Sequence, residues 1–278
     1  MTDANVTVPE GYSETFRSDV PPWEVDIVEH FTVAYYYEKF MAARDRALMA
    51  HGQDPDACHT VDCHTRYLAE LRKGDQYHIH SAPISIADGT VVFGHKLINS
   101  ATGETCATNE QTLVGADLAE SEAVIWDGPA REVRSEIPAG PGWTRAIVDI
   151  VAPKDLDRSG HMSVSAMIHR FSSAIGQLLT RAGMDPAYHR EQRIGYSTFE
   201  FQLQILERPE VGEPIDVISC FAHVGGSSMR LVHRLQRPSD GALLAELSQF
   251  GVHLDLDARR PSKIPEPMAS RAKAMVVG

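Results

Sequence analysis

Two stretches of the chain place apolar residues at helical spacing over about five turns each. They span residues 32–51 and 163–182, and the first has no internal Gly or Pro. The residues that recur on one face are Phe40, Ala43, Ala47 and Ala50 in the first stretch and Phe171, Ile175, Leu178 and Leu179 in the second. Gly52 and Gly183 follow directly, where a helix C-terminus favours glycine. The pattern therefore predicts two long helices.

After each helix the pattern changes to that of β-strands. Residues 76–86 alternate in part between apolar and polar positions, and residues 90–98 are rich in residues that favour strands. Thr102-Gly103 and Asp240-Gly241 indicate turns between the last two strands of each half. The order of a short strand, a long helix and a run of antiparallel strands predicts an α+β module with the helix against a curved sheet.

The two halves are diverged copies of one module. The pattern V-x-P-x3-D-x3-H-x2-V-x6-F occurs at residues 20–40 and again at residues 151–171, an offset of 131. Further along, the offset becomes 138, and the matched pairs include His95/His233, Leu97/Leu235, Gly103/Gly241, Ala107/Ala245 and Gln111/Gln249. So many matches in two registers indicate an internal duplication. The change of offset predicts extra residues in the second copy, in a loop around residues 208–212.

The duplication predicts two modules joined by a linker. The modules cover residues 12–118 and 143–257. Residues 119–142 are rich in Pro, Gly and charge, and we expect a linker that packs along the surface. The C-terminal tail, residues 258–278, has little periodicity and is expected to be loosely ordered.

Charge and composition narrow the class of partner. The formal net charge of −12 argues against a nucleic-acid binder. Residues 1–139 carry 10 Lys and Arg against 23 Asp and Glu, whereas the remainder carries 16 against 15, so an anionic ligand would favour the second half. No apolar run approaches the roughly 20 residues that cross a bilayer, and the N-terminus has no apolar signal core. The sequence predicts a cytoplasmic protein that binds no membrane.

The cysteines and histidines predict neither a metal site nor a cofactor. Cys58, Cys63, Cys106 and Cys220 form no CxxC pair and no zinc-ligand spacing. In a reducing compartment we expect them to pack as small apolar thiols. The thirteen histidines form no HExxH-type pattern.

The sharpest candidate for chemistry is the segment DLDRSGHMS, residues 155–163, just before the second helix. Gly160 would let the backbone approach a ligand closely. The N–H groups of a helix's first turn favour developing negative charge, and the Asp157 carboxylate could activate water or attack a carbonyl carbon. These are the minimum parts for acyl transfer. The plainer alternative is that Asp157 braces the loop and Ser163 caps the helix.

This segment resembles the D-x-D-x-x-G-H-x-N signature of hotdog-fold acyl-CoA thioesterases of the 4-hydroxybenzoyl-CoA thioesterase type, with Ser163 in the last position. Three blocks of the first copy, residues 20–36, 59–71 and 107–111, resemble the thioesterases of carnitine and betaine metabolism, which hydrolyse betainyl-type acyl-CoA esters. The second resemblance covers nearly all of the first copy and, more weakly, the second copy.

The resemblance implies a double hotdog, in which two tandem modules pair within one chain as two single modules would. It implies a catalytic carboxylate at Asp157 and, by the repeat, at Asp26, with the thioester carbonyl polarised by the N–H of Gly160. The resulting catalytic candidates are Asp157, Gly160, His161, Asp26 and His30. In the first copy Glu29 replaces the glycine, and its charge would oppose an oxyanion. We therefore expect two unequal sites, the one with Asp157 being the better.

The same blocks suggest residues that contact substrate. The substrate-binding candidates are Ser163, His64, Tyr67, Glu70 and Tyr35. Helical geometry cannot bury all of Tyr35, Tyr36 and Tyr37, and an aromatic ring there would suit a trimethylammonium group. A composite site that combines Asp157 and Gly160 with His64 or Glu70 is an alternative.

Two further groups of residues have weaker assignments. Arg66, Arg230 and Arg234 could meet coenzyme A phosphates, although a solvated strand face is as good an interpretation. His95 and His233 occupy equivalent strand positions, which favours packing or hydrogen bonding over catalysis.

These observations favour an acyl-CoA thioesterase acting on a small, polar acyl group, with coenzyme A present only as part of the substrate. A hotdog 3-hydroxyacyl-CoA dehydratase or hydratase is an alternative, but its usual D-x4-[NH]-x2-H motif is not found. A non-catalytic acyl-CoA-binding module is a third interpretation, which the weaker motif of the first copy suggests. Exposed sheet edges would allow a homo-oligomer of the pseudo-dimer.

Overall fold

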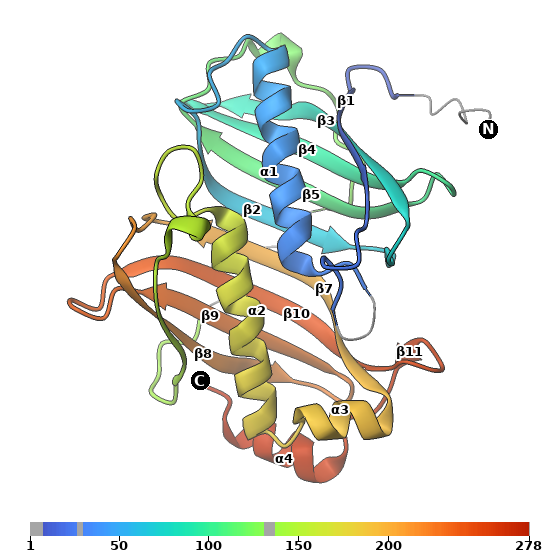
Figure 1. Cartoon of the computed structure of the whole chain (residues 1–278), viewed down its shortest axis with the longest axis vertical. Helices are drawn as coiled ribbons and strands as arrows, with labels where there is room; N and C mark the ends of the chain where they lie inside the picture. The colour runs from blue at the N-terminus through green and yellow to red at the C-terminus, as the bar shows by residue number, and fades with distance from the viewer. Residues whose placement is uncertain (1–7, 27–29, 131–136, 278) are drawn as a thin grey trace. The chain divides into compact units, whose positions relative to one another are not determined.

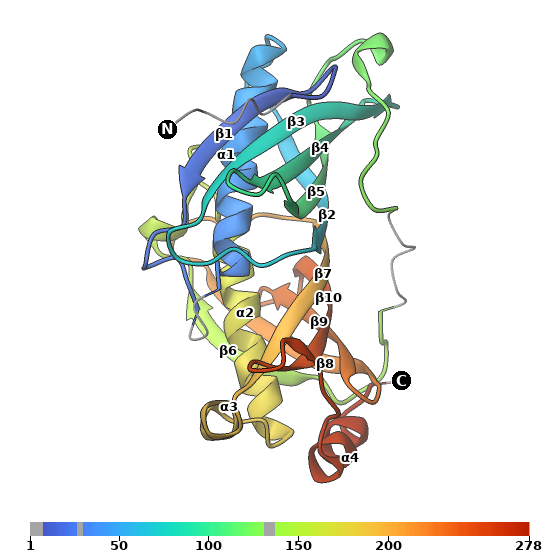
Figure 2. The same ribbon diagram turned by 90° about the vertical axis from the view of Figure 1, so that its right-hand side faces the viewer.

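The computed structural model describes residues 8–26, 30–130 and 137–277, and the chain divides into two compact units. Unit 1 is Met1–Glu132 and unit 2 is Val133–Gly278. In each unit a long helix lies against one face of an antiparallel sheet (Figure 1). In the side view of Figure 2, the long helix of each unit lies along one face of that unit's sheet.

Unit 1 has the strand order β1–β3–β4–β5–β2. Its elements are β1 Ser13–Asp19, α1 Val33–Ala50, β2 His59–Tyr67, β3 Gln76–Ala87, β4 Thr90–Asn99, β5 Thr105–Val114 and the short 3-10 helix η1 Glu120–Glu122. Phe40 and Ala43 of α1 pack on Tyr77, Ile79 and Leu97 of the sheet, as the helical pattern predicted. Ala50, the last residue of the predicted face, lies at the helix end and is exposed.

Unit 2 has the strand order β7–β10–β9–β8–β6, with β11 paired to the end of β10. Its elements are β6 Thr144–Ile150, the 3-10 helix η2 Pro153–Asp155, α2 Val164–Arg181, α3 Pro186–Gln192, β7 Ile194–Ile205, β8 Pro214–Val224, β9 Ser228–Gln236, β10 Leu243–Asp255, β11 Arg260–Pro261 and α4 Glu266–Ala274. Gly52 and Gly183 follow the long helices with φ of +70° and +94°, which confirms the predicted helix ends.

The extra residues of the second copy do not lie where the sequence predicted. Strand β2 ends at Tyr67, seven residues before Gly74, and β7 ends at Ile205, seven residues before Gly212, so the loops before the two glycines match in length. The additional residues form α3, between α2 and β7. The prediction of an insertion at residues 208–212 was therefore wrong.

The C-terminal tail is ordered, contrary to the prediction. Helix α4 buries Ala269 and Ala272, and Ile264 before it is also buried, in a cluster that contains Phe221 and Leu178. After α4 the chain pairs with β8, where the Val277 N–H donates to the carbonyl of Phe221 at 3.0 Å. The tail is short, so its periodicity was weak, but tertiary contacts supply the apolar burial that orders it.

The segment after β5 packs along unit 1. The N–H of Val124 donates to the carbonyl of Pro83 at 2.9 Å. The Trp126 ring sits so close to Gly94 that a Cβ there would come within 2.5 Å of it. Lys96 forms an ion pair with Asp127, and its ammonium group lies 5.8 Å from the centre of the Trp126 ring.

A buried ion pair ties each long helix to the loop that precedes it. In unit 2, the Arg170 guanidinium on α2 donates to both oxygens of Asp155, at 2.9 and 2.6 Å, and Asp155 is 4% exposed. In unit 1, Lys39 donates to Glu24 at 2.8 Å, and both are under 10% exposed. These positions are equivalent by the 131-residue offset, so the duplication has kept the pair while exchanging Lys–Glu for Arg–Asp.

A second repeated feature lies in the two cores. His95 and His233 each place Nδ1 on a serine hydroxyl of the neighbouring strand, Ser81 at 2.6 Å and Ser219 at 2.7 Å. Both rings are fully buried, and each packs beside a phenylalanine of its helix. Burial lowers the pKa of each histidine to about 3. The expected packing role of these histidines is confirmed.

All four cysteines are buried and none is in a disulfide among the described residues, as predicted. No helix in the described part of the chain is both long enough and apolar enough to cross a membrane.

Replacing Asp155 by Ala should lower the free energy of unfolding by about 3 kcal/mol, because the guanidinium of Arg170 loses both bonds to Asp155 and keeps only its bond to Asp149 at 3.0 Å. Urea denaturation measures this change. The matched control is Asp257→Asn, which breaks a pair with Arg193 whose side chains are 64% and 66% exposed. An exposed pair contributes little to stability, so equal losses in the two variants would contradict the structural role.

The core histidines should make stability fall on acidification. Between pH 6.5 and about 3 the unfolded chain binds protons at His95 and His233 that the native state does not bind, so each adds a slope of up to about 1.4 kcal/mol per pH unit. The double variant His95→Gln, His233→Gln should show a shallower dependence between pH 6 and 4.5 in urea titrations. The exposed His59→Gln should keep the original slope, and an unchanged slope in the double variant would contradict the assignment.

Candidate functional site

Both candidate sites lie in the loops that precede the long helices, which we call the pre-helix loops: residues 24–32 in unit 1 and 155–163 in unit 2. In unit 2, the Asp157 N–H donates to the carbonyl of His161 at 2.9 Å, and the Ser163 N–H donates to that of Asp155 at 2.8 Å. The equivalent bonds of unit 1 join Asp26 to His30 at 2.8 Å and Thr32 to Glu24 at 2.9 Å. The described ends of the two loops thus carry the same backbone bonds, and each loop has an aspartate at its third residue.

The Asp157 carboxylate is half-buried and held from two sides. Its Oδ1 accepts the Ser159 N–H at 2.9 Å and the Ser159 hydroxyl at 2.6 Å. Its Oδ2 accepts a hydrogen bond from Arg208, which lies in the loop between β7 and β8. Burial alone would raise the pKa of this carboxyl, but the bonds from Ser159 and the charge of Arg208 outweigh it and hold the pKa below its usual value. Asp157 is therefore an anion at neutral pH.

Gly160 occupies the left-handed region, with φ of +80°, and a Cβ there would meet no atom within 4 Å. Its N–H donates to the Asp157 carbonyl at 3.1 Å. His161 is partly exposed, and its Nδ1 lies 3.0 Å from the carbonyl of Ser159. In this conformation the Gly160 amide, which the resemblance assigns to the thioester carbonyl, is bonded within a tight turn.

The pre-helix loop of unit 1 brings three predicted residues together. The exposed Asp26 carboxylate accepts the His30 N–H at 3.0 Å, and His30 Nε2 lies 3.4 Å from Glu70 Oε2. Glu70, predicted as a substrate contact, thus lies beside a predicted catalytic residue. Glu29, on which the expected asymmetry of the two sites rested, lies outside the described residues.

The other substrate candidates fall into different environments. Of the three consecutive tyrosines, Tyr36 and Tyr37 are buried, and Tyr35 is half-buried with the Lys39 ammonium 5.9 Å from its ring centre. The Tyr67 ring packs edge-on against Tyr36, and burial raises its pKa. His64 is buried on β2, with Nδ1 at 3.3 Å from the Glu110 carboxylate.

The arginine candidates lie on strands. Arg230 donates to Ser248 at 3.0 Å and lies 3.5 Å from Glu200, and Arg234 donates to Glu246 at 2.9 Å. A phosphate would have to compete with these carboxylates for either guanidinium. Arg66 lies on β2 opposite Thr108 of β5.

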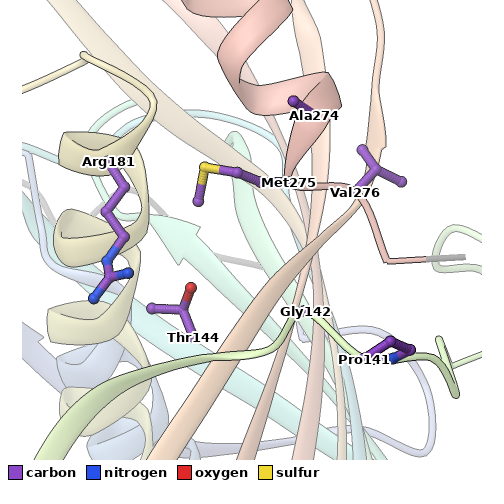
Figure 3. Close-up of a pocket in the computed structure, with 7 residues that line it drawn as sticks. All are labelled: Pro141, Gly142, Thr144, Arg181, Ala274, Met275 and Val276. Atoms are coloured by element: carbon purple, nitrogen blue, oxygen red, sulfur yellow. The ribbon is translucent and has the colours of Figure 1, made fainter.

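A surface pocket of about 460 Å³ lies at the opposite end of α2 from the pre-helix loop (Figure 3). Arg181, the last residue of α2, lines it together with Thr144 and Met275. None of the predicted site residues contributes to it. Within the described residues, no group of three or more His, Cys, Asp or Glu side chains could hold a metal ion.

Arg208 was not predicted as a site residue. It is 51 positions from Asp157 and no motif includes it. The one available signal was the repeat: with the 138-residue offset, Arg208 is equivalent to Glu70, which the sequence did single out.

The arrangement of helix, sheet and pre-helix loop in each unit is typical of one class of protein. Two tandem modules, each with a long helix on an antiparallel sheet and a carboxylate just before the helix, are the features of a double hotdog. The structure is similar to that of the 12:0-ACP thioesterase from Umbellularia californica, with a TM-score of 0.66 over 91% of this chain and 98% of that one, at 9% identity. The predicted α+β double-hotdog fold is thereby confirmed.

The family follows from the sequence itself. The model of the thioesterase-like superfamily matches residues 20–140 and again residues 151–272. The chain belongs to this superfamily and carries its domain twice. The predicted membership of a thioesterase family of hydrolases is thereby confirmed.

Two curated relatives match the first copy. The betainyl-CoA thioesterase of Pseudomonas aeruginosa is 28% identical over 122 residues, which make up 41% of this chain and 76% of the relative. The L-carnitine dehydrogenase/betainyl-CoA thioesterase of Agrobacterium fabrum is 29% identical over 106 residues, 36% of this chain. The match spans only 22% of that relative's length. The predicted resemblance to these thioesterases is confirmed for the first copy.

Ser163 caps α2, since its hydroxyl accepts the Ala166 N–H at 3.2 Å. Ser163→Ala should lower the free energy of unfolding by about 1 kcal/mol, which chemical denaturation measures. Ser163→Asp should retain most of the cap. The matched control is Thr32→Ala, because among the described residues Thr32 makes no side-chain capping bond at the start of α1. A loss in Thr32→Ala as large as in Ser163→Ala would contradict the capping role.

Proposed function

We propose that this hotdog thioesterase hydrolyses coenzyme A thioesters, and that the Asp157 carboxylate carries the reaction. The observation that carries the proposal is the geometry of the unit 2 pre-helix loop. It holds an ionised carboxylate within three residues of a glycine that has open space where a Cβ would lie, at the N-terminus of an 18-residue helix. That combination supplies a nucleophile or base and a region that favours negative charge.

The chemistry can follow either of two routes. Either Asp157 accepts a proton from water as the water oxygen attacks the thioester carbon, or its own oxygen attacks and forms a mixed anhydride that water then hydrolyses. In both routes the carbonyl oxygen becomes an oxyanion, which the first turn of α2 would stabilise. Collapse of the oxyanion breaks the C–S bond, and coenzyme A leaves as the thiolate and takes up a proton. The free acid is released directly in the first route and after hydrolysis of the anhydride in the second.

For the amide of Gly160 to donate to the oxyanion, its bond to the Asp157 carbonyl must lengthen or be shared. The left-handed conformation favours glycine, so any other residue would be strained there. We infer that the turn is a resting arrangement of the loop, which substrate binding would adjust.

The acyl group we propose is small and polar. The support is the similarity of the first copy to two proteins named as betainyl-CoA thioesterases. The half-buried Tyr35 of α1 and the group of Asp26, His30 and Glu70 would give unit 1 aromatic and acidic surface for a cationic acyl group. Arg66, Arg230 and Arg234 remain the candidates for the coenzyme A phosphates.

One observation favours a second function, acyl-CoA binding without turnover. The Asp157 carboxylate and the Gly160 amide both have partners within the protein, so a substrate would have to share or replace these bonds. Isothermal titration with a hydrolysis-resistant thioether analogue of an acyl-CoA, beside an assay of thiol release, separates binding from catalysis.

The test of the function is a panel of acyl-CoA substrates, from acetyl-CoA and betainyl-CoA to long-chain esters, with thiol release as the readout. Asp157→Asn should lower kcat by at least about 100-fold, because an amide can neither attack nor accept the proton. Asp26→Asn should have a smaller effect. Asp257→Asn, in an exposed ion pair, is the matched control and should retain activity.

Three outcomes would count against the proposal. Wild-type rates in Asp157→Asn would remove this carboxylate from the mechanism. Hydration of an enoyl-CoA, without thiol release, would indicate a hydratase instead. Tight binding of acyl-CoA esters with no turnover would support the binding module.

A further inference from the structure

One position differs in charge between the two candidate sites. The N–H groups of Leu68 and Ala69 converge on the carbonyl of Cys106 at 2.8 and 3.1 Å. In unit 2, the N–H groups of the two residues before Arg208 converge on the carbonyl of Leu244 at 2.8 and 3.0 Å. Backbone geometry therefore makes Glu70 and Arg208 equivalent, as the offset of 138 also does.

Arg208 reaches from this position across the unit 2 pre-helix loop. Its Nε donates to the carbonyl of Met162 at 3.1 Å, and its Nη2 forms the ion pair with Asp157. The same Nη2 lies 3.3 Å from the hydroxyl of Ser159 and 3.4 Å from the carbonyl of His161. The side chain is only 15% exposed. One guanidinium thus fixes several groups of the loop at once, which its planar fork of donors permits.

These contacts orient the Asp157 carboxylate. Ser159 donates twice to Oδ1, which fills the two lone pairs of that oxygen, whereas Oδ2 takes the single bond from Arg208. The oxygen left with acceptor capacity is therefore Oδ2. Because Arg208 also holds the main chain at Met162 and His161, that oxygen is fixed relative to the start of α2.

In unit 1 the equivalent position carries the opposite charge. Glu70 Oε2 lies 3.4 Å from His30 Nε2 and 3.7 Å from the Arg72 guanidinium. A carboxylate at this position cannot donate to the aspartate of its loop as Arg208 does, and its negative charge disfavours a second carboxylate nearby. The two pre-helix loops share the backbone bonds at their described ends but differ in the charge at this position.

We propose that Arg208 is the positioning residue of the unit 2 site, that it directs Oδ2 of Asp157 toward the reacting carbon, and that the Arg208/Glu70 difference assigns the chemical step to unit 2. This inference rests on the proposed function. The charged and titratable groups around Asp157 besides Arg208 are the adjacent Arg158, and His161 with Glu210, whose Nε2 and Oε1 are 3.9 Å apart. None of these occupies the equivalent of Glu70.

The first experiment does not depend on activity. Carbon-13 NMR of the side-chain carboxyls should show Asp157 titrating below the ordinary value of about 3.9, and Arg208→Gln should raise its midpoint. Arg208→Lys keeps the charge and should keep most of the depression. Arg193→Gln, which removes an exposed arginine paired with Asp257, is the matched control and should leave the Asp157 midpoint unchanged.

The second experiment measures hydrolysis by the same variants. Arg208→Gln should lower kcat by about tenfold or more, with KM within about twofold, because a misdirected carboxylate affects the transition state more than substrate binding. The acid limb of its pH–rate profile should move to higher pH. Arg208→Lys should recover part of kcat, and thermal melts of each variant show whether the fold is retained.

Two results would overturn the inference. One is an Asp157 titration midpoint that is unchanged in Arg208→Gln. The other is a kcat that is unchanged or higher in a folded Arg208→Gln variant, because Arg208 would then restrain Asp157 rather than position it. Failure of the proposed function gives a different result. The wild type would then hydrolyse no thioester, while the NMR midpoint would still respond to Arg208.

Discussion

The buried ion pair between each long helix and its pre-helix loop is the constraint on which both candidate sites depend. Asp155 lies two residues before Asp157, and Arg170 clamps it to the second turn of α2 with two bonds. The position of the Asp157 carboxylate is therefore set by the helix rather than by a free loop. In unit 1, Lys39 and Glu24 form the equivalent bond, although the lengths of the two side chains differ from those of Arg170 and Asp155. The longer carboxylate accompanies the ammonium group, and the shorter one accompanies the wider guanidinium.

On this common frame the two units differ through a few side chains. Asp26 and Asp157 share their backbone bonds, but Glu70 faces one loop and Arg208 the other. The duplication has kept the buried pair and the backbone bonds at the described ends of both loops, whereas the charge at the position of Glu70 and Arg208 has changed. The near-neutral charge of the second half fits the same division, since the acidic excess lies in the first half.

Periodicity and repeats were enough to predict the fold, because both long helices and their terminal glycines leave strong local signals. The same signals missed α3, whose seven residues are too few and too polar to show a face, and α4, whose burial depends on Phe221 and other distant residues. The site was predicted in part. Asp157, Asp26 and His30 follow from a local motif, whereas Arg208 reaches Asp157 only through the fold, 51 residues along the chain.

The contacts of Asp157 bear on which of the two routes the site favours. An aspartate of ordinary pKa, about 3.9, is already ionised in all but about one molecule in a thousand at pH 7, so a further depression adds almost nothing to the population of the anion. It makes the carboxylate both a weaker base and a weaker nucleophile, so the pKa does not separate the two routes. The orientation of the carboxylate does bear on them, because Arg208 and Ser159 fix an ionised oxygen that keeps one lone pair. Under the proposed function, such an oxygen suits direct attack on the thioester carbon.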